Sequence, residues 1–285
     1  MTQRVLESAP VRHRYFKGVQ GVIHALVFSE HGDQPPLLLL HGVTGSAWLW
    51  HDVAQALAAS RPVIALDMRG HGESDWSVDH AYTTEDHVAD LEAVISALGA
   101  EQVDMAGLSW GALVGMAYAA AHPQRVRRFS IVEVEPSFSV DEFAVPERPQ
   151  HFEKVEQVRK WERGANPSAP DTLLELWARQ SVRHATQGGW CRQHDPFFYK
   201  QWPFRRDNHW DALPKLSMPV LLVNGDRTFV RAEVMQEMAK RIPNAWFERL
   251  TDCGHIAPLE APATLAGLLA TFFDEKVYRK AQSMS

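Results

Sequence analysis

The sequence predicts an α/β protein built on a mostly parallel β-sheet, because short apolar runs alternate with stretches of helical periodicity. Near-continuous apolar strands separated by amphipathic helices are typical of parallel sheets that are covered on both faces. The expected strands are Val22–Phe28, Leu37–Leu40, Val63–Leu66, Val103–Ala106, Phe129–Val134, Val220–Val223 and Trp246–Leu250. The expected helices between the second and fifth of these strands are Trp48–Ala59, Thr84–Leu98 and Trp110–His122. The first two strands precede any helix, so we expect them to form an antiparallel hairpin at the sheet edge.

The alternation of strands and helices is interrupted once, after Pro136. The following segment shows helical stretches at Phe152–Trp161 and Thr172–His184 but no convincing buried strand, and the sheet pattern resumes at Pro219. No Gly/Ser-rich hinge flanks this segment, so we interpret it as an insertion into one body rather than a separate domain. The predicted organisation is a core of residues 1–136 and 214–285 and a helical cap of residues 137–213.

The predicted cap is rich in aromatic residues. Five of the ten tryptophans fall in it, namely Trp161, Trp177, Trp190, Trp202 and Trp210. Each of them could simply belong to a small cap core, whereas together they favour a lid whose underside lines an apolar pocket. From this segment we take Phe138 and Trp190 as candidate substrate-binding residues.

Composition and charge exclude several classes of protein. The chain of 285 residues is 45% apolar and 22% charged, which is ordinary for a globular protein. Its net charge of −6 disfavours nucleic-acid binding through phosphate contacts. The N-terminus lacks the apolar core of a signal peptide, and no run of 18 apolar residues occurs, so we expect no membrane association. The two cysteines, Cys191 and Cys253, make no disulfide framework and indicate a reducing, cytoplasmic compartment.

The strongest chemical signal is the segment Gly107-Leu-Ser109-Trp-Gly111, placed between an expected strand and an expected helix. A serine in a sharp strand-to-helix turn needs small flanking residues, so that the backbone can bend and expose the hydroxyl. The same turn directs the backbone N–H of Trp110 and the helix N-terminus toward a developing oxyanion. Ser109 is therefore the predicted nucleophile, and the neighbouring Trp110 is also a candidate substrate contact.

A second glycine-containing loop, His41-Gly-Val43-Thr-Gly45, follows the strand Leu37–Leu40. Its conformation could bring the N–H of Val43 opposite that of Trp110 and so complete a two-donor oxyanion hole. We interpret His41 itself as a structural anchor for the loop.

Near the C-terminus, His255 lies on a loop that follows the last expected strand and precedes a helix. From that place a histidine can reach back to the serine across the carboxyl edge of the sheet. The neighbouring Cys253 is interpreted as a small buried residue rather than a nucleophile.

Taken together, these segments resemble the α/β-hydrolase superfamily from about Gly18 to Phe273. The segments that carry the resemblance are HGVTG, DMRGHGESD, GLSWGA, PVLLVNGD and CGHIAPLEAP. The resemblance implies a mostly parallel eight-stranded sheet flanked by helices, with the cap inserted after the sixth strand. It also implies that Ser109 is the nucleophile and His255 the base, and that the N–H groups of Val43 and Trp110 form the oxyanion hole.

The triad acid departs from the usual pattern of the superfamily. The usual position, in a G-x-x-D turn that starts here at Gly225, is occupied by Thr228. Some branches place the acid directly after the sixth strand, and Glu133 lies there, in a stretch that resembles the haloalkane dehalogenases. A glutamate at the end of an apolar strand is costly to bury unless it is paired, so Glu133 is the first choice. Asp226 and Glu135 remain the alternatives.

The favoured function is a serine hydrolase that cleaves a carboxylic ester or lactone of a bulky apolar or aromatic small molecule through an acyl-enzyme. Serine as nucleophile argues against haloalkane dehalogenases and epoxide hydrolases, which use an aspartate there. An alternative is a carbon–carbon bond hydrolase acting on ring-cleavage dienoates, which needs cationic groups for a substrate carboxylate. Candidates for those groups are Arg183, Arg192, Arg205 and Arg206. A third possibility is a ligand receptor of hydrolase fold.

No cofactor or metal is expected. The histidines that lie nearest one another, His184 and His194 or His209, lack the spacing of metal ligands, and no dinucleotide-binding fingerprint or phosphate loop is present. The expected partner is a small-molecule ester, and the expected state is a monomer or a homodimer.

Overall fold

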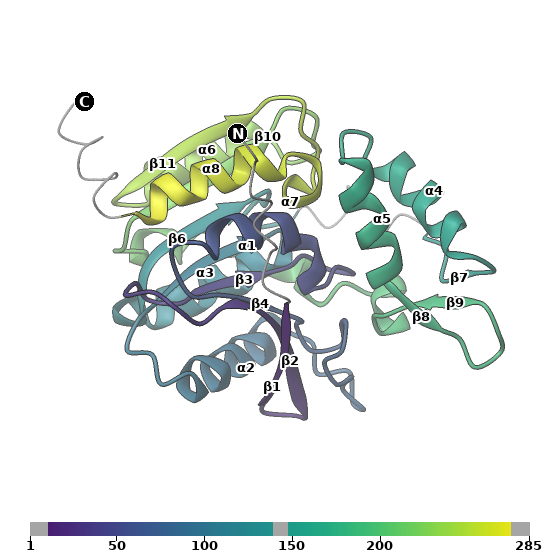
Figure 1. The fold of residues 1–285 in the computed structure, drawn as a ribbon. Helices are drawn as coiled ribbons and strands as arrows, with labels where there is room; N and C mark the ends of the chain where they lie inside the picture. Colours follow the sequence, from purple (N-terminus) through teal and green to yellow (C-terminus); the bar gives the residue numbers. More distant parts are fainter. Residues whose placement is uncertain (1–10, 139–147, 275–285) are drawn as a thin grey trace, which may run out of the picture.

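The computed structural model describes residues 11–138 and 148–274. These residues form an eight-stranded sheet, the helices that cover it, and a smaller lobe (Figure 1). The strand order across the sheet is β1-β2-β4-β3-β5-β6-β10-β11. The strands are β1 (Arg12–Lys17), β2 (Val22–Ser29), β3 (Leu37–Leu40), β4 (Val63–Leu66), β5 (Val103–Leu108), β6 (Val126–Val132), β10 (Val220–Gly225) and β11 (Ala245–Leu250). From β4 to β11 all neighbours run parallel. The predicted α/β-hydrolase sheet is thus confirmed.

The antiparallel hairpin at the sheet edge consists of β1 and β2, not of the first two apolar runs as expected. Strand β2 pairs with β1, whereas β3 lies inside the sheet, parallel to β4 and β5. The sequence of β1, RHRYFK, buries only Phe16, because this edge strand has one neighbour and mostly faces water. Without an apolar run, this edge strand gives little signal in the sequence.

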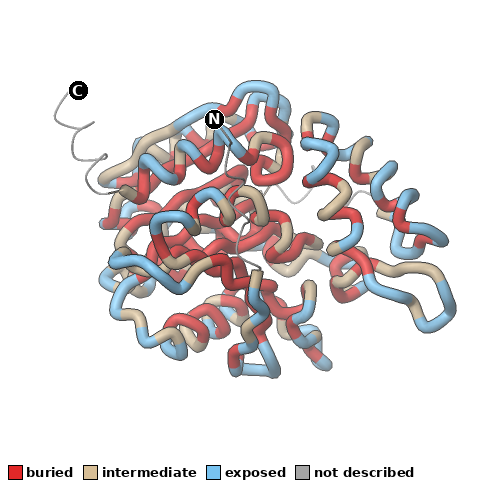
Figure 2. Tube along the Cα trace, in the orientation of Figure 1, coloured by how far each residue is buried: buried red, intermediate tan, exposed pale blue. Residues whose placement is uncertain are grey.

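The helices cover both faces of the sheet. Helices α1 (His51–Leu57) and α8 (Pro262–Phe273) share one apolar cluster with the sheet. Helices α2 (Thr84–Ala97), α3 (Trp110–Ala121) and α6 (Ala232–Arg241) pack into a second cluster on the opposite face. Figure 2 shows the strands between them as the most continuously buried part of the chain. In the described part of the chain, no helix is both long and apolar enough to cross a bilayer.

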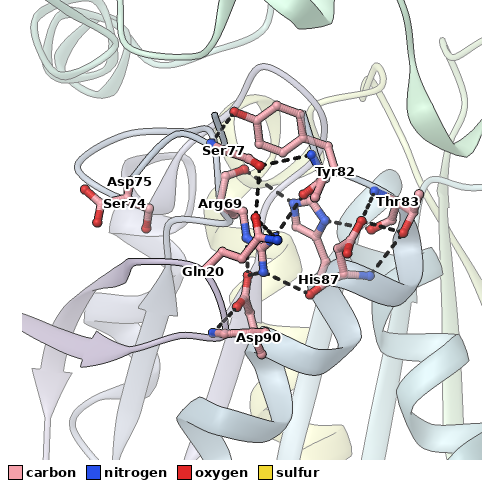
Figure 3. Close-up of polar contacts among 12 residues, drawn as sticks. Gln20, Arg69, Ser74, Asp75, Ser77, Tyr82, Thr83, His87 and Asp90 are labelled. Carbon is pink, nitrogen blue, oxygen red and sulfur yellow. Dashed lines mark hydrogen bonds and ion pairs between the residues drawn. The ribbon is translucent and has the colours of Figure 1, made fainter. Parts of the chain in front are cut away.

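A buried polar network fixes the loop after β4 (Figure 3). Arg69 Nε donates to Asp90 Oδ2 of α2 at 2.8 Å, and both side chains are almost fully buried. The hydroxyl of Tyr82 accepts from the N–H of Ser77 at 2.8 Å and donates to Asp195 Oδ2 at 2.6 Å. Because Asp195 belongs to the inserted segment, this network also ties the smaller lobe to the core.

The insertion between β6 and β10 forms the smaller lobe, which stands beside the carboxyl ends of the central strands (Figure 1). Its elements are β7 (His151–Phe152), α4 (Val155–Ala165), α5 (Asp171–Gln180), β8 (Val182–His184), β9 (Trp190–Arg192) and three short 3-10 helices, Pro196–Tyr199, Pro203–Arg206 and Leu213–Lys215. The lobe is not purely helical as expected, since β7, β9 and β8 form a small antiparallel sheet. Strands of two or three residues are too short to show a period of two in the sequence. Residues 139–147 of the predicted cap lie outside the described part.

Candidate active site

Ser109 lies in a sharp turn between β5 and α3, with φ 52° and ψ −122°. Positive φ is costly for a residue with a side chain and is often found where function requires it. The flanking glycines make the turn possible: a Cβ atom at Gly107 would lie 2.6 Å from the backbone of Ala112, and one at Gly111 would lie 2.5 Å from the carbonyl oxygen of His41. The turn places Ser109 in the wall of two neighbouring cavities.

Glu133 follows β6, the strand next to β5, and it also has a positive φ, of 56°. Its carboxylate is fully buried and lies 3.3 Å from Nδ1 of His255, measured from Oε2. His255 is half-buried and lines both of the cavities that Ser109 lines. The structure thus gathers Ser109, Glu133 and His255 at the carboxyl edge of the sheet, although they come from three separate loops.

The buried carboxylate of Glu133 is surrounded by hydrogen-bond donors. Oε1 accepts from the backbone N–H of Gly225 and, at 3.1 Å, from Nδ2 of Asn224. Oε2 accepts from the hydroxyl of Thr228 at 2.5 Å. These donors, together with His255, provide the pairing that a buried carboxylate needs.

The two alternative acids are engaged elsewhere. The exposed Asp226 accepts a hydrogen bond from the backbone N–H of Cys253 at 3.0 Å. Backbone hydrogen bonds from Asp252 and Cys253 hold the pKa of Asp226 below its usual value. Glu135 forms an ion pair with Arg231, with 2.6 Å between Oε2 and Nη2. In the described part of the chain, neither carboxylate contacts His255.

The loop from His41 to Gly45 passes directly over Ser109. A Cβ atom at Gly42 would lie 3.1 Å from Cβ of Ser109, and Val43 lines the larger cavity. Trp110 is the first residue of α3, so its N–H has no partner within the helix. Val43 and Trp110, which carry the two predicted oxyanion donors, therefore directly follow two residues that lie close together, Gly42 and Ser109.

Two buried histidines hold this loop in place. His41 Nδ1 donates to the carbonyl of Gly42 at 2.7 Å, and its Nε2 accepts from the N–H of Met68 at 2.9 Å. Burial lowers the pKa of His41 to about 4, so the ring is neutral near pH 7. His71 Nε2 accepts from the N–H of Thr44 at 3.1 Å. These contacts agree with a structural role for His41, whereas the role of His71 was not foreseen.

The larger cavity has a volume of about 550 Å³ and lies between the core and the inserted lobe. Its aromatic wall consists of Phe138, Trp161, Trp177, Trp202, Phe204 and Phe229. A smaller cavity of about 240 Å³ is also lined by Ser109 and His255. A compartment of this size and lining can enclose a small organic molecule.

Of the three predicted substrate-binding side chains, only Phe138 is placed at a cavity. Trp110 is fully buried, and its indole donates to Thr84 Oγ1 at 3.2 Å. Trp190 packs on His184, with ring centroids 3.9 Å apart. Neither side chain lines the two cavities, because Trp110 faces the core beneath the turn and Trp190 belongs to the small sheet. That their side chains contact substrate therefore stays a prediction, which the lining of these two cavities does not support.

The cavity contains charged residues that the sequence did not single out. Arg148 lines it although no motif surrounds this residue in the sequence. Of the four arginines named from the sequence, only Arg192 lines the larger cavity. Arg183, by contrast, stacks on Trp76, with its guanidinium carbon 4.8 Å from the ring centroid.

One group of side chains in the described residues could hold a metal ion, and it lies apart from the cavities. Ligand atoms of His13, His24 and Glu73 lie within 4.8 Å of one another on the antiparallel edge of the sheet. His13 Nδ1 is 2.9 Å from His24 Nε2, which is a hydrogen bond that needs no metal.

The burial of Cys253 raises the pKa of its thiol to about 12. The thiol is therefore protonated near pH 7 and does not act as a nucleophile. Both Cys253 and Cys191 are free.

Comparison with known proteins agrees with this geometry. The family model described as "alpha/beta hydrolase fold" matches residues 35–262. A 3-hydroxybutyrate-oligomer hydrolase of Cupriavidus necator is 26% identical over 271 residues, which cover 86% of this chain and 91% of that protein. A 2-hydroxymuconate semialdehyde hydrolase of Pseudomonas sp. is 28% identical over 247 residues, which cover 84% of this chain and 87% of that protein.

Among solved structures, E-2-(acetamidomethylene)succinate hydrolase superposes with a TM-score of 0.83 at 22% identity, covering 93% of this chain and all of that one. At this identity the likeness concerns the fold. The two relatives by sequence act on different substrates according to their names, so the comparisons assign the family and leave the substrate to be argued from the cavity.

Proposed function

We propose that this chain, which belongs to the α/β-hydrolase fold family, is a serine hydrolase. Its proposed substrate is a carboxylic ester or lactone of a bulky apolar or aromatic small molecule. The observation that carries the proposal is the arrangement of Ser109, His255 and Glu133. Ser109 and His255 line the same cavities, and the buried Glu133 contacts Nδ1 of the histidine.

In this mechanism His255 removes the proton of the Ser109 hydroxyl as the oxygen attacks the ester carbonyl. Glu133 holds the Nδ1–H tautomer, so that Nε2 is free to accept the proton, and stabilises the imidazolium that forms. The histidine then protonates the leaving alcohol, which yields the acyl-enzyme. A water molecule activated by His255 releases the acid and restores the serine.

The backbone N–H groups of Val43 and Trp110 are the proposed oxyanion donors. Such donors stabilise the tetrahedral intermediate more than the ground-state carbonyl, and each lowers the activation barrier by about 3 kcal/mol in comparable sites. The hydrogen bonds of His41 and His71 support this role because they fix the loop before substrate arrives.

A carbon–carbon bond hydrolase is the second candidate. Arg192 in the larger cavity and the 2-hydroxymuconate semialdehyde hydrolase among the relatives favour it. An ester remains the first choice, because an alkoxide leaves with less assistance than a carbanion.

The test combines labelling with turnover. A fluorophosphonate probe should label the wild-type chain at Ser109, and Ser109→Ala should lose both the label and several orders of magnitude in kcat. Ser96→Ala, at an exposed position of α2, is the matched control and should keep both. Comparing the turnover of a panel of aryl, alkyl and cyclic esters with the turnover of a panel of dienoates separates the ester hydrolase from the carbon–carbon bond hydrolase. Binding without turnover of any panel member would instead support a receptor.

We further propose that the enzyme acts in the cytoplasm, a location that the two free cysteines support. The proposed chemistry uses side chains and backbone groups alone. It acts on a small molecule and requires neither an assembly nor a cofactor.

A further inference from the structure

The larger cavity is lined by three arginines, and their charge partners differ. A guanidinium beside an apolar cavity loses hydration and is stabilised by a carboxylate partner. Arg192 has such a partner, because its Nη1 lies 2.5 Å from Oε1 of Glu162. Arg227 has one as well, because its Nη1 lies 2.9 Å from Oδ1 of Asp252.

Arg148 lacks such a partner among the residues that the structure describes. Its Nη1 donates to the hydroxyl of Thr44 at 2.6 Å, and its guanidinium carbon lies 5.7 Å from the ring centroid of Trp161. A hydroxyl and an aromatic ring stabilise a cation but do not neutralise it. Burial, which is the main cause, and the nearby charge of Arg192 lower the pKa of Arg148, while the charge of Glu162 opposes them.

The remaining charged groups of the cavity do not balance Arg148. The charge of Glu162 acts on Arg148, but this carboxylate forms an ion pair with Arg192. On the core side, Oε2 of Glu260 lies 3.9 Å from Nη2 of Arg227, and burial raises the pKa of Glu260. Burial, aided by the charges of Arg192 and Arg148, lowers the pKa of His194 to about 3, so that ring is neutral near pH 7. Among the residues that the structure describes, the wall near Arg148 therefore carries a surplus positive charge.

The position of Arg148 relates this charge to the reaction centre. Thr44, which accepts its hydrogen bond, directly follows Val43, the proposed oxyanion donor. A substrate that placed its carbonyl beside Val43 and Ser109 would therefore hold its next few atoms near the guanidinium.

From these contacts we infer that the enzyme selects esters that carry a free carboxylate, which Arg148 binds inside the cavity. This inference rests on the proposed function and narrows its substrate class to monoesters of dicarboxylic acids and similar acidic esters. Arg148 is then a specificity-determining residue, and the aromatic wall binds the apolar remainder of the substrate.

The kinetic experiment compares two esters that differ in one charge, 4-nitrophenyl hydrogen glutarate and its neutral methyl ester. The wild-type enzyme should show the higher kcat/KM with the acid. Arg148→Met should reduce the ratio of kcat/KM for the acid to that for the neutral ester by roughly 10- to 100-fold, as expected for a charge-assisted hydrogen bond. Arg148→Lys, which keeps the charge, should retain part of the ratio.

Two further variants sharpen the comparison. Arg159→Met removes an arginine of α4 that pairs with Glu175 and does not line the cavity, so it should leave the ratio unchanged. Glu162→Gln removes a negative charge beside Arg148 and should raise the ratio severalfold. If Arg148→Met slows both esters equally, the residue acts only through Thr44 and the inference is overturned. A wild-type preference for the neutral ester would overturn it as well.

A binding measurement separates this inference from the proposed function. Phenylacetate and neutral phenylacetamide are titrated into Ser109→Ala and into Ser109→Ala/Arg148→Met, with calorimetry as the readout. We expect phenylacetate to bind Ser109→Ala more tightly than the amide and to lose that advantage in the double variant. If the esters are not cleaved but this pattern holds, the proposed function fails and the anion site stands. Equal binding of acid and amide to Ser109→Ala would remove the anion site even if esters are cleaved.

Discussion

The hydroxyl of Thr228 donates a hydrogen bond of 2.5 Å to Oε2 of Glu133, the same oxygen that lies 3.3 Å from Nδ1 of His255. Thr228 follows β10 and Glu133 follows β6, and these strands are parallel neighbours with Val132 opposite Val223. Loops at the ends of the two strands therefore reach the same point. The residue in the usual place of the acid thus becomes a donor to a carboxylate supplied by the adjacent strand.

This relationship predicts which carboxylate matters for catalysis. Glu133→Gln keeps the size of the side chain but removes the charge that holds the histidine tautomer, so kcat should fall by up to roughly 10⁴-fold. Asp226→Asn should cost less than about tenfold, because its exposed carboxylate only accepts backbone hydrogen bonds of the turn at Cys253. Steady-state kinetics of both variants on one chromogenic ester provide the measurement. The assignment is falsified if Asp226→Asn is the crippling change.

The hydroxyl of Thr228 should contribute through Glu133 alone. Thr228→Val keeps the shape of the side chain but removes the hydrogen-bond donor, and we expect kcat to fall by about tenfold. Hydrogen bonds to charged groups contribute roughly 1.5–3 kcal/mol, and part of that contribution is lost on reorganisation. Thr228→Ser keeps a hydroxyl and should restore most of the rate. A serine variant as slow as the valine variant would show that packing, not the hydrogen bond, is responsible. Thermal unfolding of both variants controls for general damage.

The sequence was sufficient for the parts of the structure that rest on local constraints. The apolar runs predicted the inner strands, because a strand buried on both faces must be apolar along its length. The turn at Ser109 was predictable, since close approaches at Gly107 and Gly111 exclude larger residues. Glu133 was conspicuous because it ends an apolar strand.

Other features depend on tertiary contacts that leave little trace in the sequence. Strand β1 was missed because an edge strand buries little, and the small sheet of the inserted lobe because its strands are very short. The aromatic character of Trp190 predicts a substrate contact, but aromatic residues pack into small cores equally well, as Trp190 does on His184. Arg148 was overlooked, since its importance follows from the absence of a carboxylate beside it among the described residues and not from its neighbours in the sequence.

The aromatic wall of the larger cavity predicts a preference for large acyl or alcohol groups. Each added methylene that is buried should be worth roughly 0.8 kcal/mol, so kcat/KM should rise about fourfold per carbon until the cavity is filled. Phe138→Ala should weaken this dependence, because Phe138 lines both cavities and packs on Phe204 with centroids 5.3 Å apart. Trp190→Ala, at an aromatic residue of the same lobe away from the cavities, should not. Equal kcat/KM for acetate and longer esters in the wild type would contradict the prediction.

The last prediction concerns acid stability. His41 is fully buried, its Nδ1 donates to Gly42, and its Nε2 accepts from the N–H of Met68, a bond that only the neutral ring can make. Burial lowers its folded-state pKa to about 4, whereas the unfolded chain should titrate near about 6.5. Between these values the unfolded state binds a proton that the folded state does not. The contribution of the neutral ring is therefore fully present above about pH 6.5 and is lost as the pH falls toward 4.

His71 and His194 are buried with lowered pKa values as well, and that of His194 falls to about 3, so their effects add to that of His41. As the pH falls through this window, each such histidine should lower the free energy of unfolding by up to about 1.4 kcal/mol per pH unit. Urea unfolding between pH 7.5 and 4.5 measures the slope directly. His41→Gln should make it shallower by about one proton, whereas His151→Gln, at an exposed residue of β7, should leave it unchanged. A free energy of unfolding that stays constant down to pH 4.5 would contradict the buried, neutral state of these rings.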